Sequence, residues 1–511
     1  MSSRDFNLFA HFQEINAARA SNELLRTDQD ARYTYGDIEN RSAQLARYLT
    51  DLGISPGDRV SVQVEKSPDA LCLYLACLRA GFVFHPLNMG YKAGELEYFL
   101  GNAEPAVVVC DARNESAIGK IAHAAGVRHL YTLNADGHGS LADRSSESAG
   151  EFDTLRRDKG DLAALLYSSG TTGVPKGIML THDNLLSNTA TLVDSWGFTA
   201  DDRLLHALPI FHVHGLFVAI GCVMLSGASM RWLPAYDAQQ VVRYLPECTV
   251  LMGVPTYYTR LLAEPSFTAA IAANTRLFIS GSAPLLAETF AEFAARTGQR
   301  ILERYGMTET NMNTSNPLAG ERKPGTVGPP LPGIEVRVCD DQGTLLAPGN
   351  TGNLQVRGPN VFAGYWKMPD KTADDFSADG FFKTGDNALI DSDGYVSIVG
   401  RAKDLVITGG LNVYPKEVEL FIDSLPGIRE SAVIGVPHPD FGEAVVAVAV
   451  AETGATPDES EIIDNAKEQL ANFKVPKRVV FVDELPRNSM AKVQKNVLRE
   501  SWDALFDTAV S

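Results

Sequence analysis

The chain has 511 residues, of which 45% are hydrophobic and 21% are charged, and its formal net charge is −18. This length exceeds what one compact core accommodates, so two or three domains are expected, and the composition is that of an ordinary globular protein. The acidic balance, without a long lysine or arginine run, disfavours nucleic acid as a partner. Small molecules are therefore the expected partners, and the oligomeric state is left open.

The cysteines and the apolar runs indicate the compartment. The six cysteines are scattered without CxxC spacing and are expected to be buried thiols in a reducing environment: Cys72, Cys77, Cys110, Cys222, Cys248 and Cys339. The longest apolar run, 216–225, is about half of the roughly 20 residues that a membrane span needs. The first ten residues lack the apolar core of a signal peptide. The sequence therefore predicts a cytoplasmic protein without a membrane span.

The first third of the chain alternates helical and strand patterns. Apolar residues recur at helical spacing in 35–52, where Ile38, Leu45 and Leu49 share a face, and at strand spacing in 59–64. A helix is also expected at 71–80, with strands at 106–110 and 161–167. Alternation of this kind predicts α/β layers with much parallel sheet.

The middle of the chain changes character between 333 and 400. Short strands are expected at 336–339, 352–357 and 395–399, separated by Asp- and Gly-rich turns. This pattern predicts a small β subdomain beside the α/β body.

The last 110 residues carry their own helices and strands. A helix at 415–424, strands at 431–436 and 444–451, a helix that begins with the capping box Thr456–Glu459, and a strand at 478–482 are expected. The predicted division is a large N-terminal domain, 1–400, and a smaller α+β C-terminal domain, 401–511.

A glycine- and hydroxyl-rich segment, YSSGTTGVPKG at 167–177, directly follows a predicted strand. Its glycines free the backbone to curl round an anion, its hydroxyls offer donors to phosphate oxygens, and Lys176 adds positive charge. The spacing is not that of the common GxxxxGK[ST] phosphate loop. By composition alone, the segment is equally consistent with a flexible surface loop.

This segment resembles the signature of the adenylate-forming superfamily, which contains acyl-CoA synthetases, peptide-synthetase adenylation domains and beetle luciferases. Further motifs stand in the order of that family: GSAP at 281–284, RYGMTE at 304–309, TGD at 384–386, GRAKD at 400–404, Gly409-Gly410, and PRN at 486–488 before Lys492. The resemblance covers essentially the full chain.

The resemblance implies a site for ATP and magnesium. The implied ATP-binding residues are Ser168, Ser169, Gly170, Thr172, Gly173, Lys176, Ser282, Ala283, Tyr305, Gly306, Met307, Thr308, Asp386 and Arg401. The flat ring of Tyr305 suits stacking on adenine, and Asp386 suits hydrogen bonds from both ribose hydroxyls, with Arg401 reaching the same sugar. Glu309 and Thr171 are the implied Mg²⁺ ligands, since magnesium takes few carboxylates beside phosphate and water.

The resemblance also implies two half-reactions, with ATP, Mg²⁺ and coenzyme A. A carboxylate first attacks the α-phosphate of ATP, with Lys492, Thr171 and Glu309 as catalytic residues, because positioned cations stabilise the anionic transition state. The thiol of coenzyme A then displaces AMP. Between the two steps the mobile C-terminal domain rotates about Lys403, and Gly409 and Gly410 come to face the thiol.

One position departs from the family pattern. Ala491 stands where the family usually has glycine before the catalytic lysine. If that position requires a positive φ, alanine costs roughly 1 kcal/mol. We expect activity to survive.

Four acyl-pocket segments, 209–216, 253–260, 276–284 and 303–317, resemble malonyl-CoA synthetases most closely. A dicarboxylate brings a second charge that must meet a cation when buried, and an arginine can grip a carboxylate bidentately. His212, Arg260 and Arg276 are the predicted substrate residues, with Arg304 as a further candidate.

The predicted function is ATP-dependent ligation of malonate to coenzyme A. Methylmalonate remains open, because one methyl group is worth only about 1–3 kcal/mol in discrimination. Three further functions stay open: ligation of another short or medium acid, adenylation by a standalone enzyme that loads a carrier protein, and nucleotide binding without catalysis.

Overall fold

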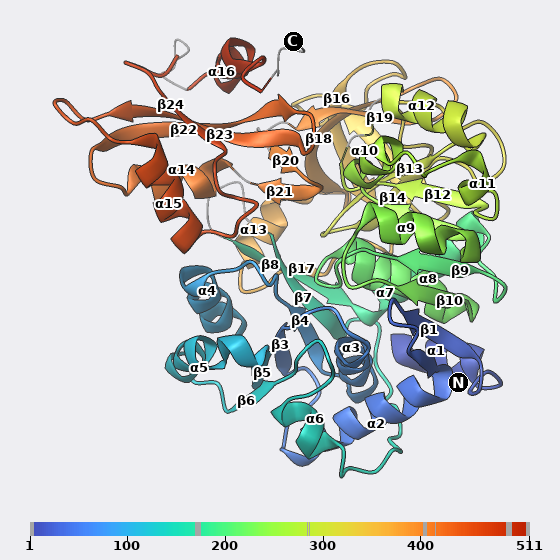
Figure 1. Ribbon diagram of the computed structural model, residues 1–511. Helices are drawn as coiled ribbons and strands as arrows, with labels where there is room; N and C mark the ends of the chain where they lie inside the picture. The colour runs from blue at the N-terminus through green and yellow to red at the C-terminus, as the bar shows by residue number, and fades with distance from the viewer. Residues whose placement is uncertain are drawn as a thin grey trace.

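The computed structural model describes residues 5–168, 175–283, 285, 287–401, 406–413, 415–486 and 493–506. Within these residues the chain forms three sheets in a large N-terminal part and a further sheet in a smaller C-terminal part (Figure 1). The fold is α/β, with a small β subdomain and a separate α+β C-terminal domain, as the sequence predicts. The predicted boundary at residue 400 stays a prediction.

The first sheet has the strand order β17-β8-β7-β4-β3-β5-β6. Its strands are β3 (Arg59–Gln63), β4 (Val83–Pro86), β5 (Val107–Cys110), β6 (His129–Thr132), β7 (Leu162–Ser168), β8 (Lys176–Thr181) and β17 (Gly364–Tyr365). Its helices are α2 (Tyr35–Asp51), α3 (Pro68–Ala80), α4 (Ala93–Ala103), η1 (Ala112–Asn114), α5 (Glu115–Ala124) and α6 (Ser140–Ser145). The strands β3 to β7 run parallel, which confirms the predicted βαβ alternation.

Helix α3 illustrates why these residues form these elements. The Ser67 side chain caps it by accepting a hydrogen bond from the Ala70 amide, and Pro68 suits the first helical position. Gly81 ends it at φ 70°, a left-handed conformation that glycine adopts without a Cβ clash. The helix is almost continuously apolar because it is buried on all sides in the N-terminal core.

The second sheet has the order β14-β13-β12-β11-β9-β10-β1-β2. Its strands are β1 (Glu23–Thr27), β2 (Arg32–Thr34), β9 (Arg203–His206), β10 (Ser229–Trp232), β11 (Val250–Gly253), β12 (Leu277–Ser280), β13 (Leu302–Met307) and β14 (Asn311–Ser315). Its helices are α1 (Leu8–Asn16), α7 (His182–Trp196), η2 (His214–Ala219), α8 (Ile220–Ser226), α9 (Ala238–Tyr244), η3 (Leu245–Glu247), α10 (Pro255–Ala263), α11 (Ala269–Ala272) and α12 (Ala287–Thr297). The strands β9 to β13 are parallel, so their carboxyl ends meet at one edge.

The third sheet confirms the predicted β subdomain. It is antiparallel, with β15 (Glu335–Cys339), β16 (Gly352–Arg357), β18 (Phe382–Ile390) and β19 (Val396–Arg401) in chain order, and α13 (Pro369–Asp374) precedes β18.

The C-terminal domain is built on a long antiparallel pair, β22 (Ile428–His438) and β23 (Gly442–Ala451). The remaining elements are β20 (Val406–Thr408), β21 (Leu411–Val413), α14 (Pro415–Asp423), α15 (Glu459–Gln469), β24 (Arg478–Phe481) and α16 (Lys495–Trp502). The predicted capping box at Thr456 is wrong: Asp458 caps α15 by accepting from the amides of Ser460 and Glu461. Glu459 instead binds Arg478 at 2.8 Å, which ties the helix to β24.

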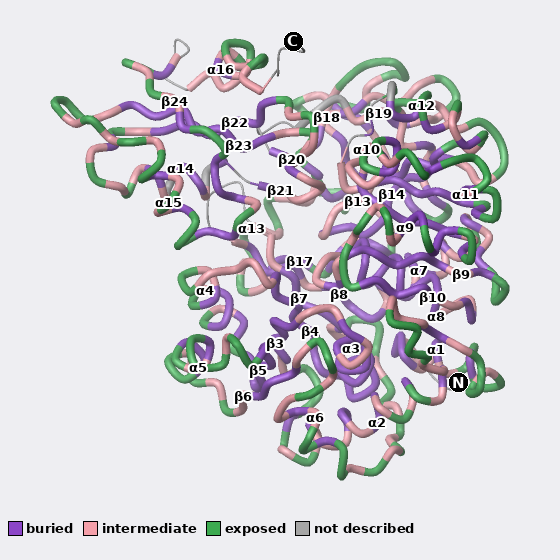
Figure 2. Tube along the Cα trace, in the orientation of Figure 1, coloured by how far each residue is buried: buried purple, intermediate pink, exposed green. Residues whose placement is uncertain are grey.

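The burial pattern follows the sheets, since the buried residues run along the strands and the surface turns are exposed (Figure 2). All six cysteines are unpaired and buried, as the sequence predicts. Among the described residues, no helix is long and apolar enough to cross a bilayer.

Candidate active site

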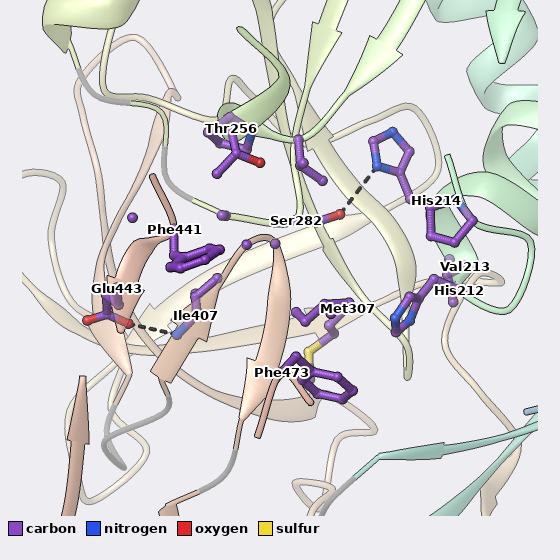
Figure 3. Close-up of a pocket in the computed structure, with 18 of the residues that line it drawn as sticks. His212, Val213, His214, Thr256, Ser282, Met307, Ile407, Phe441, Glu443 and Phe473 are labelled. Carbon is purple, nitrogen blue, oxygen red and sulfur yellow. Dashed lines mark hydrogen bonds between the residues drawn. The ribbon is translucent and has the colours of Figure 1, made fainter. Parts of the chain in front are cut away.

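A cavity of about 1420 Å³ lies where the carboxyl ends of both large sheets meet the C-terminal domain. Pro86 at the end of β4, Ser168 at the end of β7, Ser280 at the end of β12 and Met307 at the end of β13 all line it. Figure 3 shows part of this wall, with the C-terminal residues opposite. Open parallel sheets bind ligands at the carboxyl ends of their strands, so this is where a substrate site is expected.

The predicted adenine and ribose residues come together although they lie far apart in sequence. The Tyr305 hydroxyl on β13 donates a hydrogen bond to the Asp386 carboxylate on β18, and both residues line the cavity. Asp386 is buried, and its amide donates to Thr384 Oγ1 at 3.1 Å. A Cβ on Gly306 would lie 1.8 Å from the Asn311 carbonyl oxygen on the paired strand β14, so this position of β13 requires glycine. Met307 and Thr308 also line the cavity.

The predicted phosphate loop is described only at its two ends. Ser168 and Pro175 line the cavity, and β7 and β8 lead directly into and out of the loop. Ser169, Gly170, Thr171, Thr172 and Gly173 lie outside the described residues. Their roles stay predictions.

Lys176, at the start of β8, is buried, and its Nζ lies 4.0 Å from Asp375 Oδ2 and 4.5 Å from the centre of the Tyr365 ring. It does not belong to the described residues that line the cavity. A direct contact with phosphate stays a prediction for this residue.

Ser282 and Ala283 follow β12 and line the cavity. Ser282 has φ 72°, in the left-handed region that a residue with a side chain seldom adopts. Its Oγ lies 3.3 Å from His214 Nδ1, as the dashed line in Figure 3 indicates. The turn therefore holds a hydroxyl against the wall that η2 forms.

The other end of the cavity holds unpaired polar groups. Arg304 on β13 is only 3% exposed, and its Nε and Nη2 have no hydrogen-bond partner among the described residues. His212 Nε2, His214 Nε2 and Ser280 Oγ are likewise buried without a partner there. A Cβ on Gly281 would lie 2.4 Å from Arg304 Cζ, so only glycine leaves room for the guanidinium. Buried polar groups without partners are rare in folded proteins, and a set of them on a cavity wall indicates a ligand.

The electrostatics at this end follow from burial. Burial lowers the pKa of Arg304 to about 9 and that of His212 to about 4. Burial, with the nearby Arg304 charge as a second cause, holds the pKa of His214 well below its usual range. Glu303, the neighbour of Arg304 on β13, lines the cavity as well, and burial raises its pKa to about 8, so this carboxyl is mostly neutral at pH 7. Arg304 is therefore the charged group of this end, and it is positive.

The structure corrects the assignment of Arg276 as a substrate residue. Arg276 precedes β12, at the amino edge of the sheet and away from the carboxyl edge that forms the cavity. Its guanidinium binds both oxygens of Asp202 at 2.8 Å and the carbonyls of Trp196 and Gly197, which end α7. These bonds hold α7 to the second sheet.

Arg260, on α10, lies at the rim of the cavity. Its guanidinium makes a bidentate pair with Asp440 of the C-terminal domain, with Nε–Oδ1 at 3.0 Å and Nη2–Oδ2 at 2.8 Å. Thr259 and Asp440 line the cavity, whereas Arg260 does not and is 44% exposed. Its contact with a substrate carboxylate stays a prediction.

Glu309, the predicted magnesium ligand, follows the Tyr305–Thr308 segment and is buried. One of its oxygens lies 3.5 Å from the Tyr365 hydroxyl. The described residues hold no group of three or more His, Cys, Asp or Glu side chains that could bind a metal. A single carboxylate beside a nucleotide site suits Mg²⁺, which takes most of its ligands from phosphate and water.

Lys492, Ala491 and Lys403 lie outside the described residues, and so does the side chain of Arg401. The backbone of Arg401 pairs with Asp386 between β19 and β18, next to the predicted ribose residue. Pro486 and Val493, which flank the lysine segment, do not line the cavity.

The Gly409–Gly410 turn forms the C-terminal wall of the cavity. Both glycines line it and have positive φ, and a Cβ on Gly410 would lie 2.9 Å from Val254 Cγ1 of the N-terminal domain. This turn therefore lies close to Val254, in one of the predicted acyl-pocket segments, and its role beside the thiol stays a prediction.

Sequence reasoning missed Lys474, which lines the cavity from the C-terminal domain. Its Nζ lies 2.6 Å from Glu95 Oε1 on α4 and 2.7 Å from Glu417 Oε1 on α14. Since α4 belongs to the other domain, no local sequence pattern could have found this contact. His214, Ser280 and Glu303 were missed as well, although three of the four acyl-pocket segments contain them.

Comparison with known proteins agrees with this architecture. The family model described as AMP-binding enzyme matches residues 12–366, and the model of the AMP-binding enzyme C-terminal domain matches 417–492. The chain is 36% identical to the malonate–CoA ligase ACSF3, mitochondrial, of Bos taurus, over 95% of this chain and 89% of that protein.

Two solved structures are similar over nearly the full chain. ATP-bound MatB from Rhodopseudomonas palustris is 52% identical with a TM-score of 0.78, covering 98% of this chain and 100% of that one. A malonyl-CoA ligase with methylmalonyl-CoA and AMP bound is 36% identical with a TM-score of 0.80, covering 92% and 97%. With two domain models and full-length relatives in agreement, the chain belongs to the family of AMP-binding enzymes.

Proposed function

We propose that the protein joins malonate to coenzyme A through a malonyl-adenylate, converting ATP to AMP and pyrophosphate. The names of its relatives, malonate–CoA ligase and malonyl-CoA ligase, support this reaction class. The observation that carries the choice of acid is the buried Arg304 guanidinium, which has unpaired donors on the cavity wall.

A dicarboxylate suits this end of the cavity better than a monocarboxylate. The carboxylate that does not react would accept from Arg304, with His212 and His214 as further polar groups. An apolar acid would leave a buried cation without a counter-ion, and an unpaired buried charge is costly. Neutral Glu303 adds no repulsion at pH 7.

In the first half-reaction a malonate oxygen attacks the α-phosphorus of ATP, and the bond to the pyrophosphate oxygen breaks. Tyr305 would carry the adenine and Asp386 the ribose, while the loop after Ser168 and Lys492 would hold the phosphates. Bound Mg²⁺, held by Glu309 and Thr171, would neutralise phosphate charge. The residues named here position and stabilise, and no enzyme-bound covalent intermediate forms.

In the second half-reaction the coenzyme A thiol loses its proton, its sulfur attacks the acyl carbonyl, and the carbon–oxygen bond to AMP breaks. The Gly409–Gly410 turn would line the path of the thiol. Gly410 itself packs against Val254, where an added Cβ would lie 2.9 Å from Cγ1, so the turn brings its backbone to the cavity without a side chain in between. Rotation of the C-terminal domain about Lys403 would alternate this face with Lys492.

Arg260 is a second candidate for gripping the free carboxylate. Its partner Asp440 and its neighbour Thr259 both line the cavity, so release from Asp440 would bring the guanidinium to the opening. Methylmalonate is a further substrate candidate. A cytoplasmic location stays a prediction, and the bovine relative is named as a mitochondrial protein.

A pyrophosphate-release assay with malonate, methylmalonate, succinate, acetate and butyrate, with and without coenzyme A, tests the proposal. We expect release that depends on malonate, and mass spectrometry should identify malonyl-CoA when the thiol is present. Faster turnover of butyrate than of malonate would overturn the assignment of the acid. Adenylation without thioester formation would favour a carrier-loading enzyme instead.

A further inference from the structure

A second cavity, of about 240 Å³, adjoins the first one. Pro86, Leu87, Pro209, Phe211 and Tyr257 line both cavities and thus form the wall between them. The rest of the second cavity is mainly apolar and reaches the exposed Ala235. An apolar cavity of about 150 Å³ is large enough to hold a benzene ring, so this one can hold a ring-sized ligand.

Two charged side chains line this cavity, Lys66 and Glu65. Glu65 is committed to Arg113, whose Nη2 lies 3.1 Å from Glu65 Oε1. Lys66 makes no ion pair with any described residue. Its Nζ donates to His206 Nδ1 and to the His206 carbonyl oxygen, both at 2.8 Å, and lies 4.4 Å from the centre of the Trp232 ring.

His206 cannot supply the missing negative charge. Its Nε2 lies 3.0 Å from the Gly215 carbonyl oxygen, which only accepts, so Nε2 carries the ring proton and Nδ1 is the acceptor for Lys66. Burial, with the neighbouring Lys66 as a second cause, holds the pKa of His206 well below its usual range. The ring is therefore neutral. An ammonium at Lys66 has three N–H groups, and His206 accepts two of them.

We propose that this second cavity is an accessory binding site for a monocarboxylate with a compact apolar body, whose carboxylate pairs with Lys66. The apolar walls would take the body, and the third N–H of the ammonium would donate to a carboxylate oxygen. A dicarboxylate such as malonate fits poorly, since its second charge would meet no cation there. The ligand class therefore differs from that of the main cavity.

Occupancy of the accessory site should be felt in the main cavity. Tyr257 stacks on Tyr236 with ring centres 3.9 Å apart, and Phe211 directly precedes His212. A ligand in the second cavity would restrict the side chains of Tyr257 and Phe211, which line both cavities. This second effect rests on the proposed function, whereas binding itself does not.

Binding of the carboxylate should also be accompanied by uptake of a proton by the protein. Burial holds the pKa of Lys66 well below its usual range, and a carboxylate beside it would restore the charged form. The other titratable groups that line this cavity are Glu65, Tyr236 and Tyr257, and His206 contacts Lys66 without lining the cavity. Burial raises the pKa of Tyr257 to about 12 and that of Tyr236 further. Since both tyrosines stay protonated at neutral pH, proton uptake on binding would come from Lys66 or from His206 beside it, and its loss in Lys66→Met would assign it to Lys66.

Isothermal titration calorimetry with benzoate, and with benzyl alcohol as the neutral probe of the same shape, tests the site in the full chain. We expect one benzoate per chain, affinity at least about tenfold above that of benzyl alcohol, and buffer-dependent heats that indicate proton uptake. Lys66→Met should lower the benzoate affinity about tenfold or more. Lys159→Met, at a 70% exposed lysine, is the matched control and should leave it unchanged.

Two further variants guard against misfolding and misplacement. Ala235→Phe should fill the cavity from its exposed side and abolish benzoate binding while Lys66 is kept. Arg304→Met, in the main cavity, should leave benzoate binding intact. The proposal is overturned if benzoate does not bind, if it binds Lys66→Met and Ala235→Phe as well as the parent, or if only Arg304→Met removes it. Malonate-dependent pyrophosphate release, measured separately, tells failure of this site from failure of the proposed function.

Discussion

Lys474 and Arg304 are both buried cations that line the main cavity, yet their surroundings are opposite. Lys474 lies within 2.7 Å of two carboxylates, Glu95 and Glu417, one from each domain. Arg304 has two nitrogens without any partner among the described residues. A compensated buried charge holds structure together, whereas an uncompensated one awaits a ligand. The comparison separates two roles that the residue types alone do not distinguish.

The largest expected effect comes from removing the compensated cation. Lys474→Met leaves two buried carboxylates facing each other, so the free energy of unfolding should fall by about 3–5 kcal/mol. Urea denaturation measures it. The triple variant Lys474→Met/Glu95→Gln/Glu417→Gln removes the repulsion and should recover most of the loss. If Lys474→Met unfolds with the same free energy as the parent, Lys474 does not stabilise the fold through its two carboxylates.

Removing the uncompensated cation should have the reverse profile. Arg304→Met should lower kcat/KM for malonate about 100-fold, in line with roughly 2–5 kcal/mol for a buried charged partner. Its free energy of unfolding should stay unchanged or rise, because a buried charge without a partner disappears. Steady-state kinetics with malonate and butyrate measure the first effect. Equal losses on both acids would argue against a carboxylate at Arg304.

Glu303 makes both stability and malonate binding depend on pH. Its folded pKa of about 8 lies above the ordinary 4.5, so the stability that its protonated form contributes is full below pH 4.5 and is lost as the pH rises through 8. Above pH 8 its charge should repel malonate and raise KM up to about tenfold. Glu303→Gln should flatten both profiles. A pH-independent KM in the parent would contradict this assignment.

Arg276 provides a matched structural pair outside the cavity. Asp202→Asn weakens its bidentate contact and should cost about 1–2 kcal/mol of unfolding free energy. KM for malonate should not change, because Arg276 holds the end of α7. A several-fold rise in that KM, with the fold intact, would restore Arg276 to the substrate site.

The smallest effect is expected at the exposed link between the domains. Arg260 and Asp440 are 44% and 46% exposed, so Asp440→Asn should change the unfolding free energy by less than about 1 kcal/mol. High salt should reduce even this difference. Comparing it with Lys474→Met measures how much burial strengthens a contact between the same two domains. If Asp440→Asn lowers the unfolding free energy as much as Lys474→Met does, solvent exposure does not determine how strongly these ion pairs stabilise the protein.

Much of the fold was predictable because local patterns determine it. Helix α2 and strands β3, β5 and β7 follow from the spacing of apolar residues. The order of short motifs also predicted that Tyr305 and Asp386, 81 positions apart, serve one site. What could not be predicted is contact between distant charged residues such as Glu95 and Lys474, since pairing depends on how the domains pack.

The error over Arg276 had a usable signal. Residues before a parallel strand lie at the amino edge of the sheet, and sites lie at the carboxyl edge. Arg276 precedes β12, whereas Arg304 lies within β13 and one residue before the cavity-lining Tyr305. Choosing between two arginines by their position on the strand would have favoured Arg304.

The backbone of Asp386, the predicted ribose residue, pairs with that of Arg401, which stands at the predicted boundary between the domains. Asp386 lies on β18, and β18 pairs with β19. The last residue of β19, Arg401, leads into the C-terminal domain. A nucleotide that stabilises the pairing of β18 with β19 would shorten the flexible linker between the domains. The C-terminal domain could then rotate in fewer directions. Bound ATP would thereby restrict the rotation of the C-terminal domain, in addition to being a substrate.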